Sequence, residues 1–246
     1  MFEIRMDNAK YWRDCLDAIV SLVNEGSFNI SKDGISLKAM DPSGISMVSF
    51  FIPGKSFSKF NIDKEASIGL NLDNLSKIMS RTRDMEALSM KDSDSKLNME
   101  FIGDSRRRYR LPIIDVRSGV EKEPDVKFET SVEMLADPLK EIIKDASQIS
   151  SYIGFKASKE QFMISAFGDS GELEEQHESG SKIIKKLDAP ENAEVTFNLE
   201  YLDSIVKGCP VGNSIKMSLK SEKPLKLSYN IKDAVLTYYL APYVSE

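Results

Sequence analysis

ASIGLNLDNLSKIM at residues 66–79 returns as AEVTFNLEYLDSIV at residues 193–206, which is 127 positions further along the chain. The two copies share an alanine, an asparagine and three apolar positions: Ala66 with Ala193, Asn71 with Asn198, Leu72 with Leu199, Leu75 with Leu202 and Ile78 with Ile205. RDCLDAIV at residues 13–20 likewise matches ADPLKEII at residues 136–143. KLNMEF at residues 96–101 resembles KLSYNI at residues 226–231. The chain of 246 residues therefore consists of two similar halves.

Each half contains two segments in which apolar residues recur at spacings of three and four. These segments predict amphipathic helices near residues 9–24, 72–82, 135–147 and 199–208. The opposite, outward side of each predicted helix carries basic side chains. They are Lys10, Arg13, Lys77, Arg81, Lys140, Lys144 and Lys207.

Most of the remaining chain alternates apolar and polar residues between polar turns, as antiparallel strands do. We therefore expect an α+β protein in which sheets pack helices on one face and meet water on the other. The stretch at residues 115–127 is polar, contains Pro124 and follows neither period. It predicts a linker between a domain at residues 1–114 and a domain at residues 128–246, although an ordinary surface loop would have the same composition.

Composition excludes several classes of protein. Hydrophobic residues make up 41% and charged residues 29%, and no apolar run reaches the ~18 residues of a membrane helix. With the strand-like opening MFEIRM, this predicts a cytoplasmic protein. The chain has two distant cysteines, a single histidine, His177, and no familiar catalytic motif, so we expect no metal site, no cofactor and no enzyme activity. The enzyme alternative, a carboxylate hydrolase, would need a paired acid in a cleft.

Several stretches resemble DNA sliding clamps of the proliferating cell nuclear antigen family, especially its archaeal members. They are MFEIR at residues 1–5, LVNEG at 22–26, DGISLKAMDPSGISMV at 33–48, LNLDNLSKIM at 70–79 and YYLAPYVSE at 238–246. The resemblance implies a ring of three two-domain chains, with sheets outside and four helices per chain lining a hole for duplex DNA. It also implies a processivity factor that tethers polymerase, flap endonuclease and ligase, is loaded by a clamp loader, and works at the nucleoid of a cell without a nucleus. A subunit of a heterotrimeric or checkpoint-type clamp is the alternative.

The net charge of −6 argues against a nucleic-acid partner unless the basic residues are concentrated where DNA passes. The resemblance places Arg13, Lys77, Lys140, Lys144 and Lys207 at or near DNA-facing positions of the family. The alternative is a solvated helix face with ion pairs, because acidic residues lie on the same predicted helices. Asp17 departs from a purely basic first helix and suggests loose contact there.

The resemblance also implies a pocket in which partner enzymes insert a short motif of glutamine and aromatic residues. Its residues would be Met40, Gly44, Ile45, Met47, Pro224, Tyr239, Leu240, Ala241 and Pro242. The alternative is that some of these residues are core. Gly44 stands where some relatives carry a larger polar residue, so we expect partner selectivity to differ.

Two runs of a single charge sign point to a subunit interface. RRRYRLPII at residues 106–114 carries Arg106, Arg107, Arg108 and Arg110, and GELEEQHESG at residues 171–180 carries Glu172, Glu174, Glu175 and Glu178. In the family, strands near these positions are the free edges that pair between subunits. Like charge prevents an edge from pairing with itself, and opposite charge favours head-to-tail closure. We expect a homotrimer; two solvated charge runs are the alternative.

Overall fold

The computed structural model describes residues 1–116 and 122–244. They form two compact units, of which unit 1 contains residues 1–42, 48–116 and 231–236 and unit 2 contains residues 43–47, 122–230 and 237–244. The predicted linker includes residues 117–121, which lie outside the described residues. Its other positions form neither helix nor strand.

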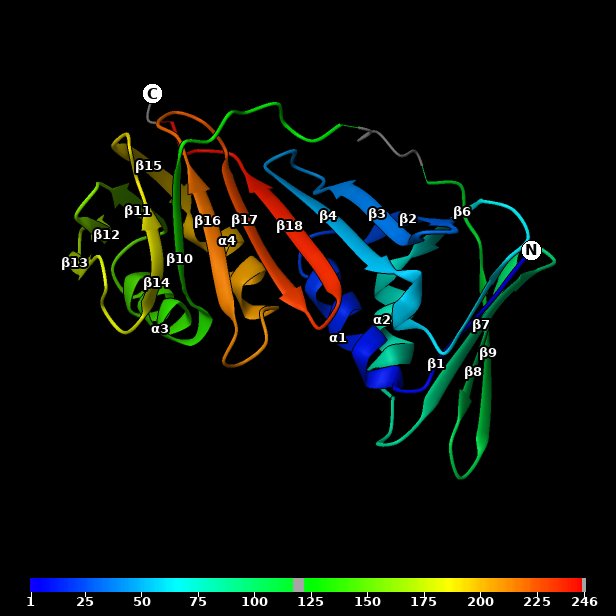
Figure 1. Cartoon of the computed structure of the whole chain (residues 1–246). Coiled ribbons are helices and arrows are strands. Elements are labelled where there is room, and N and C mark those ends of the chain that lie inside the picture. Colours follow the sequence, from blue (N-terminus) through cyan, green and yellow to red (C-terminus); the bar gives the residue numbers. More distant parts are fainter. Residues whose placement is uncertain (117–121, 245–246) are drawn as a thin grey trace. The chain divides into compact units, whose positions relative to one another are not determined.

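The first half of the chain contains two helices, nine strands and one short 3-10 turn (Figure 1). In chain order they are β1 (Phe2–Met6), α1 (Ala9–Val20), β2 (Glu25–Ser31), β3 (Gly34–Met40), β4 (Ser46–Pro53), η1 (Gly54–Ser56), β5 (Lys59–Ile62), β6 (Ala66–Asn71), α2 (Leu72–Met79), β7 (Ala87–Ser93), β8 (Lys96–Ile102) and β9 (Arg106–Pro112).

The second half repeats this order without the 3-10 turn. Its elements are β10 (Thr130–Leu135), α3 (Ala136–Ser147), β11 (Tyr152–Ala157), β12 (Gln161–Gly168), β13 (Gly171–Glu178), β14 (Ile184–Asp188), β15 (Ala193–Asn198), α4 (Leu199–Lys207), β16 (Ser214–Leu219), β17 (Leu225–Ile231) and β18 (Ala234–Leu240).

Strand pairing in the two halves is the same. The first half has the orders β5-β1-β7-β8-β9 and β4-β3-β2-β6, and the second has β14-β10-β16-β17-β18 and β13-β12-β11-β15. Corresponding strands therefore occupy corresponding places, for example β1 and β10, which each lie second in order. The predicted duplication and the α+β class are confirmed.

Asparagine side chains fix the starts of three helices. Asn8, Asn71 and Asn198 each accept a hydrogen bond from a main-chain N–H in the first turn of α1, α2 and α4. Such caps satisfy donors that have no partner inside the helix. Helix α1 ends at Val20, four residues before the predicted end, because the chain turns there and the N–H groups of Leu22 and Val23 both bond to the carbonyl of Ile19.

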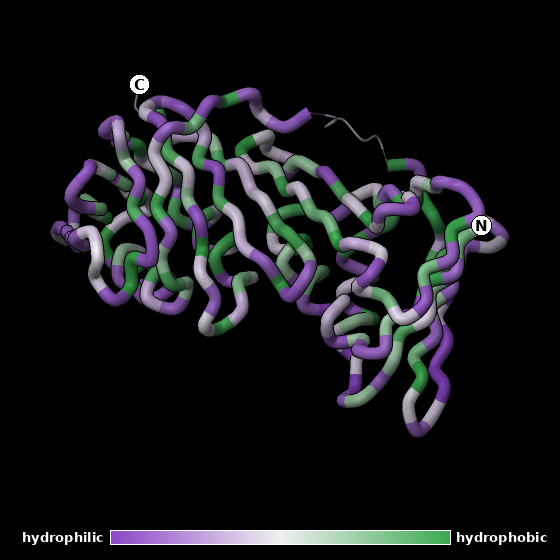
Figure 2. The backbone as a smooth tube through the Cα atoms, in the orientation of Figure 1, coloured by the Kyte–Doolittle hydropathy of each residue, from purple (hydrophilic) through white to green (hydrophobic). Residues whose placement is uncertain are grey.

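Each unit has its own apolar core beneath its helices. In unit 1 the ring of Trp12 on α1 lies 5.7 to 6.3 Å from the rings of Phe28, Phe50 and Phe57. In unit 2 Phe155 contacts Phe162 and Phe197. Figure 2 shows hydrophobic and hydrophilic residues alternating along many strands, which is the pattern of sheets with one buried face.

A buried ion pair joins three elements of unit 1. Glu86 is 4% exposed, and its Oε2 accepts hydrogen bonds from Arg107 Nη2 on β9 at 2.6 Å and from the main-chain N–H of Arg83 at 2.8 Å. The Glu86 carbonyl accepts from the N–H of Ala9 at the start of α1. The Arg107 guanidinium also lies over the ring of Phe101. Burial alone would raise the pKa of Glu86, but the bonds from Arg83 and Arg107 hold it below its ordinary value.

This ion pair predicts a specific pH dependence of folding. Because the folded pKa of Glu86 is depressed, its stabilisation is complete above the ordinary carboxyl pKa of 4.5 and is lost as the pH falls through the folded value. Glu86→Gln is expected to lower the free energy of unfolding at pH 7 by about 1.5–3 kcal/mol. Urea titrations should show this gap closing as the pH falls below 4.5; a gap of constant size would contradict the assignment.

Candidate functional site

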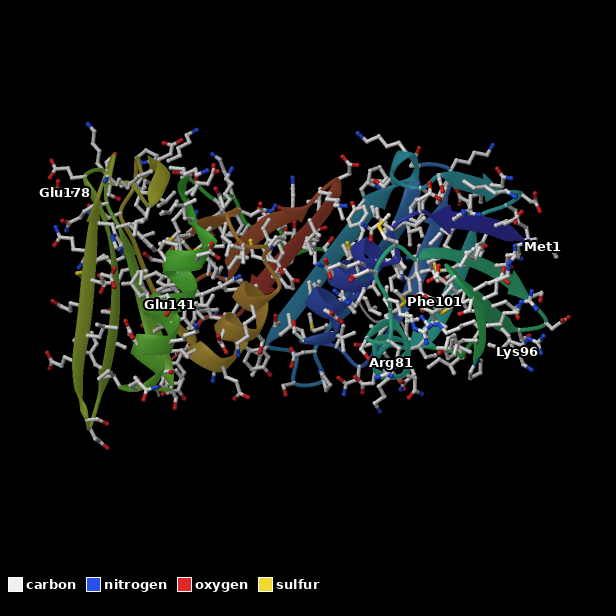
Figure 3. All side chains as sticks on the ribbon, turned by 90° about the horizontal axis from the view of Figure 1, so that it is seen from below. Met1, Arg81, Lys96, Phe101, Glu141 and Glu178 are labelled. Atoms are coloured by element: carbon white, nitrogen blue, oxygen red, sulfur yellow. The ribbon has the colours of Figure 1, made fainter. Side chains whose placement is uncertain are left out.

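The predicted DNA-facing side chains of unit 1 lie on α1, on α2 or just after the end of α2, and the two helices pack against each other. Lys10, Lys77 and Arg81 are exposed, and their side chains make no ion pair within residues 1–116 and 122–244. Arg81, labelled in Figure 3, follows the end of α2. Arg13 is half-buried and its Nη2 contacts Asp14 Oδ1 at 3.1 Å. Three of the four predicted residues are therefore free to meet an anion.

Asp17 lies at the packing surface of the two helices. Its Oδ1 accepts a hydrogen bond from Ser76 Oγ on α2 at 3.4 Å. Burial raises the pKa of Asp17, and the charge of Arg13 opposes that rise. A carboxylate in this position reduces the positive potential beside Arg13.

The basic side chains of unit 2 are engaged. Lys144 Nζ contacts Glu141 Oε1 at 2.7 Å within α3, and Lys207 pairs with Asp203 within α4. Both lysines remain exposed, so an arriving phosphate can compete for them. Lys140 was expected to point outward, but its side chain is only 19% exposed and donates to the carbonyl of Cys209 at 2.6 Å. It satisfies the carbonyl of the turn after α4, so its predicted place on the free basic face is wrong.

The predicted peptide pocket combines a loop and the C-terminal tail of unit 2. The N–H of Ala241 donates to the carbonyl of Ile45 at 2.9 Å, which fixes the tail against residues 43–47. Tyr239 donates through its hydroxyl to Glu123 at 2.7 Å, and Lys226 lies over its ring. Glu123 belongs to the described part of the linker, and its contact with the tail had no signal in the sequence.

The pocket residues divide by exposure. Ile45 is 37% exposed, Met40 at the end of β3 in unit 1 is 44% exposed, and Gly44 is exposed with a positive φ of 70°. Intermediate exposure is found for Pro224, Ala241 and Pro242. Met47, Tyr239 and Leu240 are buried, at 2%, 5% and 1% exposure. Met47 and Leu240 are therefore core residues, as the alternative interpretation of the pocket residues expected for some of them.

The two charged runs form strands at sheet edges. Among the described strands, β9 has only β8 as a neighbour and β13 has only β12. On β9 the side chains of Arg106, Arg108 and Arg110 are exposed. On β13 the exposed side chains are those of Glu172, Glu174, Gln176 and Glu178, the last labelled in Figure 3.

Two members of the predicted runs point to the other face. Arg107 pairs with Glu86 inside unit 1, and Glu175 Oε1 lies 3.2 Å from Nε2 of the buried His177. Tyr109 on β9 and Leu173 on β13 share these faces and are half-buried. Tyr109 and Leu173 were not among the interface residues expected from the sequence. Side chains alternate between the two faces of a strand, and this period of two within each charged run would have identified them.

The described residues contain one carboxyl pair. Glu129 and Glu191 interact, which lowers the pKa of Glu129 and raises that of Glu191, and Lys127 lowers both. Glu191 is exposed and Glu129 half-buried, beside Lys127 and Lys220.

Burial raises the pKa of both cysteine thiols, which makes them poor nucleophiles. Within the described residues no group of three candidate ligands is placed to hold a metal, and no helix is long and apolar enough to cross a membrane.

Comparisons with known proteins agree across the whole chain. Residues 1–118 match the N-terminal domain of proliferating cell nuclear antigen, and residues 122–244 match its C-terminal domain. The DNA polymerase sliding clamps of Thermococcus gammatolerans and Pyrococcus horikoshii are 33% and 32% identical, over 100% of this chain and 99% of theirs.

Two solved structures share the fold. Proliferating cell nuclear antigen from Thermococcus kodakaraensis matches with a TM-score of 0.94 and 24% identity, over 99% of this chain and 100% of that one. The protein from A. fulgidus, solved with the C-terminal region of FEN-1 bound, matches over all of both chains with a TM-score of 0.89 and 26% identity. The family consists of processivity factors without enzyme activity. The chain belongs to the proliferating cell nuclear antigen family of DNA polymerase sliding clamps.

Proposed function

We propose that three copies of this chain close into a ring that encircles duplex DNA and tethers polymerase, flap endonuclease, ligase and clamp loader to it. The observation that carries this proposal is the pair of charged edges β9 and β13 on one chain. Each unit, with residues 115–127 as linker, contributes one of these edges. The expected location is the archaeal cytoplasm, at the nucleoid.

The alternation of side chains limits how the edges pair. Antiparallel pairing that places Arg108 opposite Glu174 also places Arg110 opposite Glu172, both on the exposed faces. The same register brings Tyr109 opposite Leu173 on the other faces. Each exposed ion pair contributes roughly 0–1 kcal/mol, so we expect charge to set the register while main-chain bonds and apolar contacts hold it.

The charges also bear on the heterotrimer alternative. A chain that needs different partners requires one edge to fit a foreign strand. Here both complementary edges belong to the same chain, which favours self-closure. For the enzyme alternative, the carboxyl pair of Glu129 and Glu191 lies at the surface beside lysines, where water and cations neutralise it.

The exposed Lys10, Lys77 and Arg81 suit a ring that slides. Long side chains that exchange between phosphates give sequence-independent contact, and base readout would impede movement. Lys144 and Lys207 can join them by leaving their carboxylates. Arg13 and Lys140 are held by their own unit, and we assign them a smaller part.

For partner binding we propose the exposed and partly exposed pocket residues of unit 2 as the contact surface: Gly44, Ile45, Pro224, Ala241 and Pro242. Buried Met47, Tyr239 and Leu240 would support them from beneath. Met40, which belongs to unit 1 and is exposed, stays a prediction for this surface.

Ring closure is expected to respond to charge reversal. The variant with Arg108→Glu and Arg110→Glu should be monomeric at low salt, because like charges then face each other. Mixing it with the variant carrying Glu172→Lys and Glu174→Lys should restore rings. Arg107 is left unchanged because its replacement would disturb the buried ion pair. Trimers of either variant alone in light scattering would contradict the proposed contact.

DNA affinity is expected to depend on the free basic side chains. Lys77→Ala with Arg81→Ala should weaken binding to a labelled duplex and reduce the slope of log K against log salt by about 0.9 for each phosphate that is no longer neutralised. Lys140→Ala is the comparison and should change the slope less, because this lysine is held by the carbonyl of Cys209. Equal slopes for wild type and the double variant would rule out phosphate contact by these residues.

Partner binding is expected to be separable from folding. Ile45→Asp with Ala241→Asp places charge where an apolar anchor docks, and both positions are already partly exposed. Calorimetry with a flap-endonuclease C-terminal peptide should show about 30-fold weaker binding or worse. Val211→Asp, at a site that is 85% exposed, is the control. Unchanged affinity of the double variant would place the pocket elsewhere.

A further inference from the structure

A groove crosses the four-stranded sheet of unit 2 on the face opposite its buried side chains. Its volume is about 280 Å³. The floor is formed by Ser165 on β12, Gly154 on β11 and Thr196 on β15, which lie directly opposite one another in the strand registers. A Cβ atom on Gly154 would lie 2.8 Å from Ser165 Oγ, so any larger residue at Gly154 would fill the floor.

The groove has one aromatic side and one neutralised polar side. Tyr152 and Phe167 line the first, and Phe167 is 55% exposed although it is a large apolar side chain. Lys156 and Glu194 line the second and pair with each other at 3.0 Å. The walls therefore offer apolar and aromatic contact without net charge, which suits a single aromatic side chain.

The C-terminal tail already shows this type of contact. The ring of Tyr243 lies against the ring of Tyr152, with 3.9 Å between their centroids. The main-chain N–H of Tyr243 donates to the carbonyl of Thr196 at 2.8 Å. One end of the groove thus holds an aromatic ring and a main-chain donor from an extended segment. Phe167 lies at the same aromatic side and remains exposed.

The C-terminal tail connects the groove to the proposed peptide pocket. Ala241 bonds to Ile45 in that pocket, and Tyr243, two residues later, bonds to Thr196 in the groove. A partner segment lying in the pocket therefore needs only a short flank to reach the groove. Linked contacts of this type strengthen binding because the second is intramolecular.

We propose that this groove is a second docking site for partner proteins and takes an aromatic side chain from the segment that flanks the partner's peptide motif. This inference rests on the proposed function of the pocket. The partner is extended and apolar at this point, since the groove holds one side chain and carries no net charge. Recognition would then extend beyond the short motif and distinguish partners that share it.

Three peptides test the proposal by calorimetry. The first peptide is the bare glutamine-and-aromatic motif. The second is the same motif extended at each end by a Gly/Ser spacer of six residues and then a tryptophan. The third is identical to the second except that alanine replaces each tryptophan. Six extended residues span up to ~20 Å, which exceeds the two-residue step in the tail. We expect the tryptophan peptide to bind about tenfold more tightly than the alanine peptide.

Two variants test whether the tighter binding of the tryptophan peptide comes from the groove. Gly154→Leu and Ser165→Leu fill the floor from adjacent strands and should each remove the tryptophan gain while leaving the bare motif unaffected. Lys159→Leu, in the turn of the same hairpin, is the control and should keep the gain. Thermal unfolding by circular dichroism verifies folding, and the second variant serves if the first unfolds.

The outcomes separate the two proposals. Equal affinity of the tryptophan and alanine peptides for wild type would overturn the groove, as would a gain that survives both variants. Failure of the bare motif to bind would instead contradict the peptide pocket.

Discussion

An edge strand presents a row of main-chain N–H and C=O groups that have no partner in its own sheet, and among the edge strands of this molecule β9 and β13 carry opposite charge. Strand β9 exposes Arg106, Arg108 and Arg110, and β13 exposes Glu172 and Glu174. Neither edge can pair with its own kind without placing like charges together. Head-to-tail pairing between copies would give β9 and β13 each a second neighbour, and the proposed ring around DNA rests on that pairing.

The charge distribution explains how a chain with a net negative charge can contact DNA. The net charge of −6 is compatible with a sliding clamp because affinity depends on the face that meets phosphate. Lys10 on α1, Lys77 on α2 and Arg81 just after α2 have side chains that are free of ion pairs within the described residues. In unit 2 the lysines are restrained by carboxylates or by a carbonyl. We expect contact with DNA to be weak and uneven, as movement along the duplex requires.

Sequence patterns predicted the duplication, the class and the four helices because these depend on periodicity and local signals. Asn71 and Asn198, matched as repeats, turned out to cap equivalent helices. The charged runs pointed to edges, but which charges face outward depends on the pleat, so Arg107 and Glu175 were grouped with residues of the opposite face. Lys140 was misjudged because the carbonyl it binds, that of Cys209, is 69 residues away. Leu240 and Met47 could not be separated from the exposed pocket residues without knowing tertiary burial.

Sedimentation equilibrium of the purified chain at micromolar concentration tests the central claim most directly. Complementary edges on one chain predict a single species of three times 27.6 kDa, held mainly by main-chain bonds and apolar contacts between β9 and β13. A chain that stays monomeric at 27.6 kDa in low salt would contradict closure by β9 and β13.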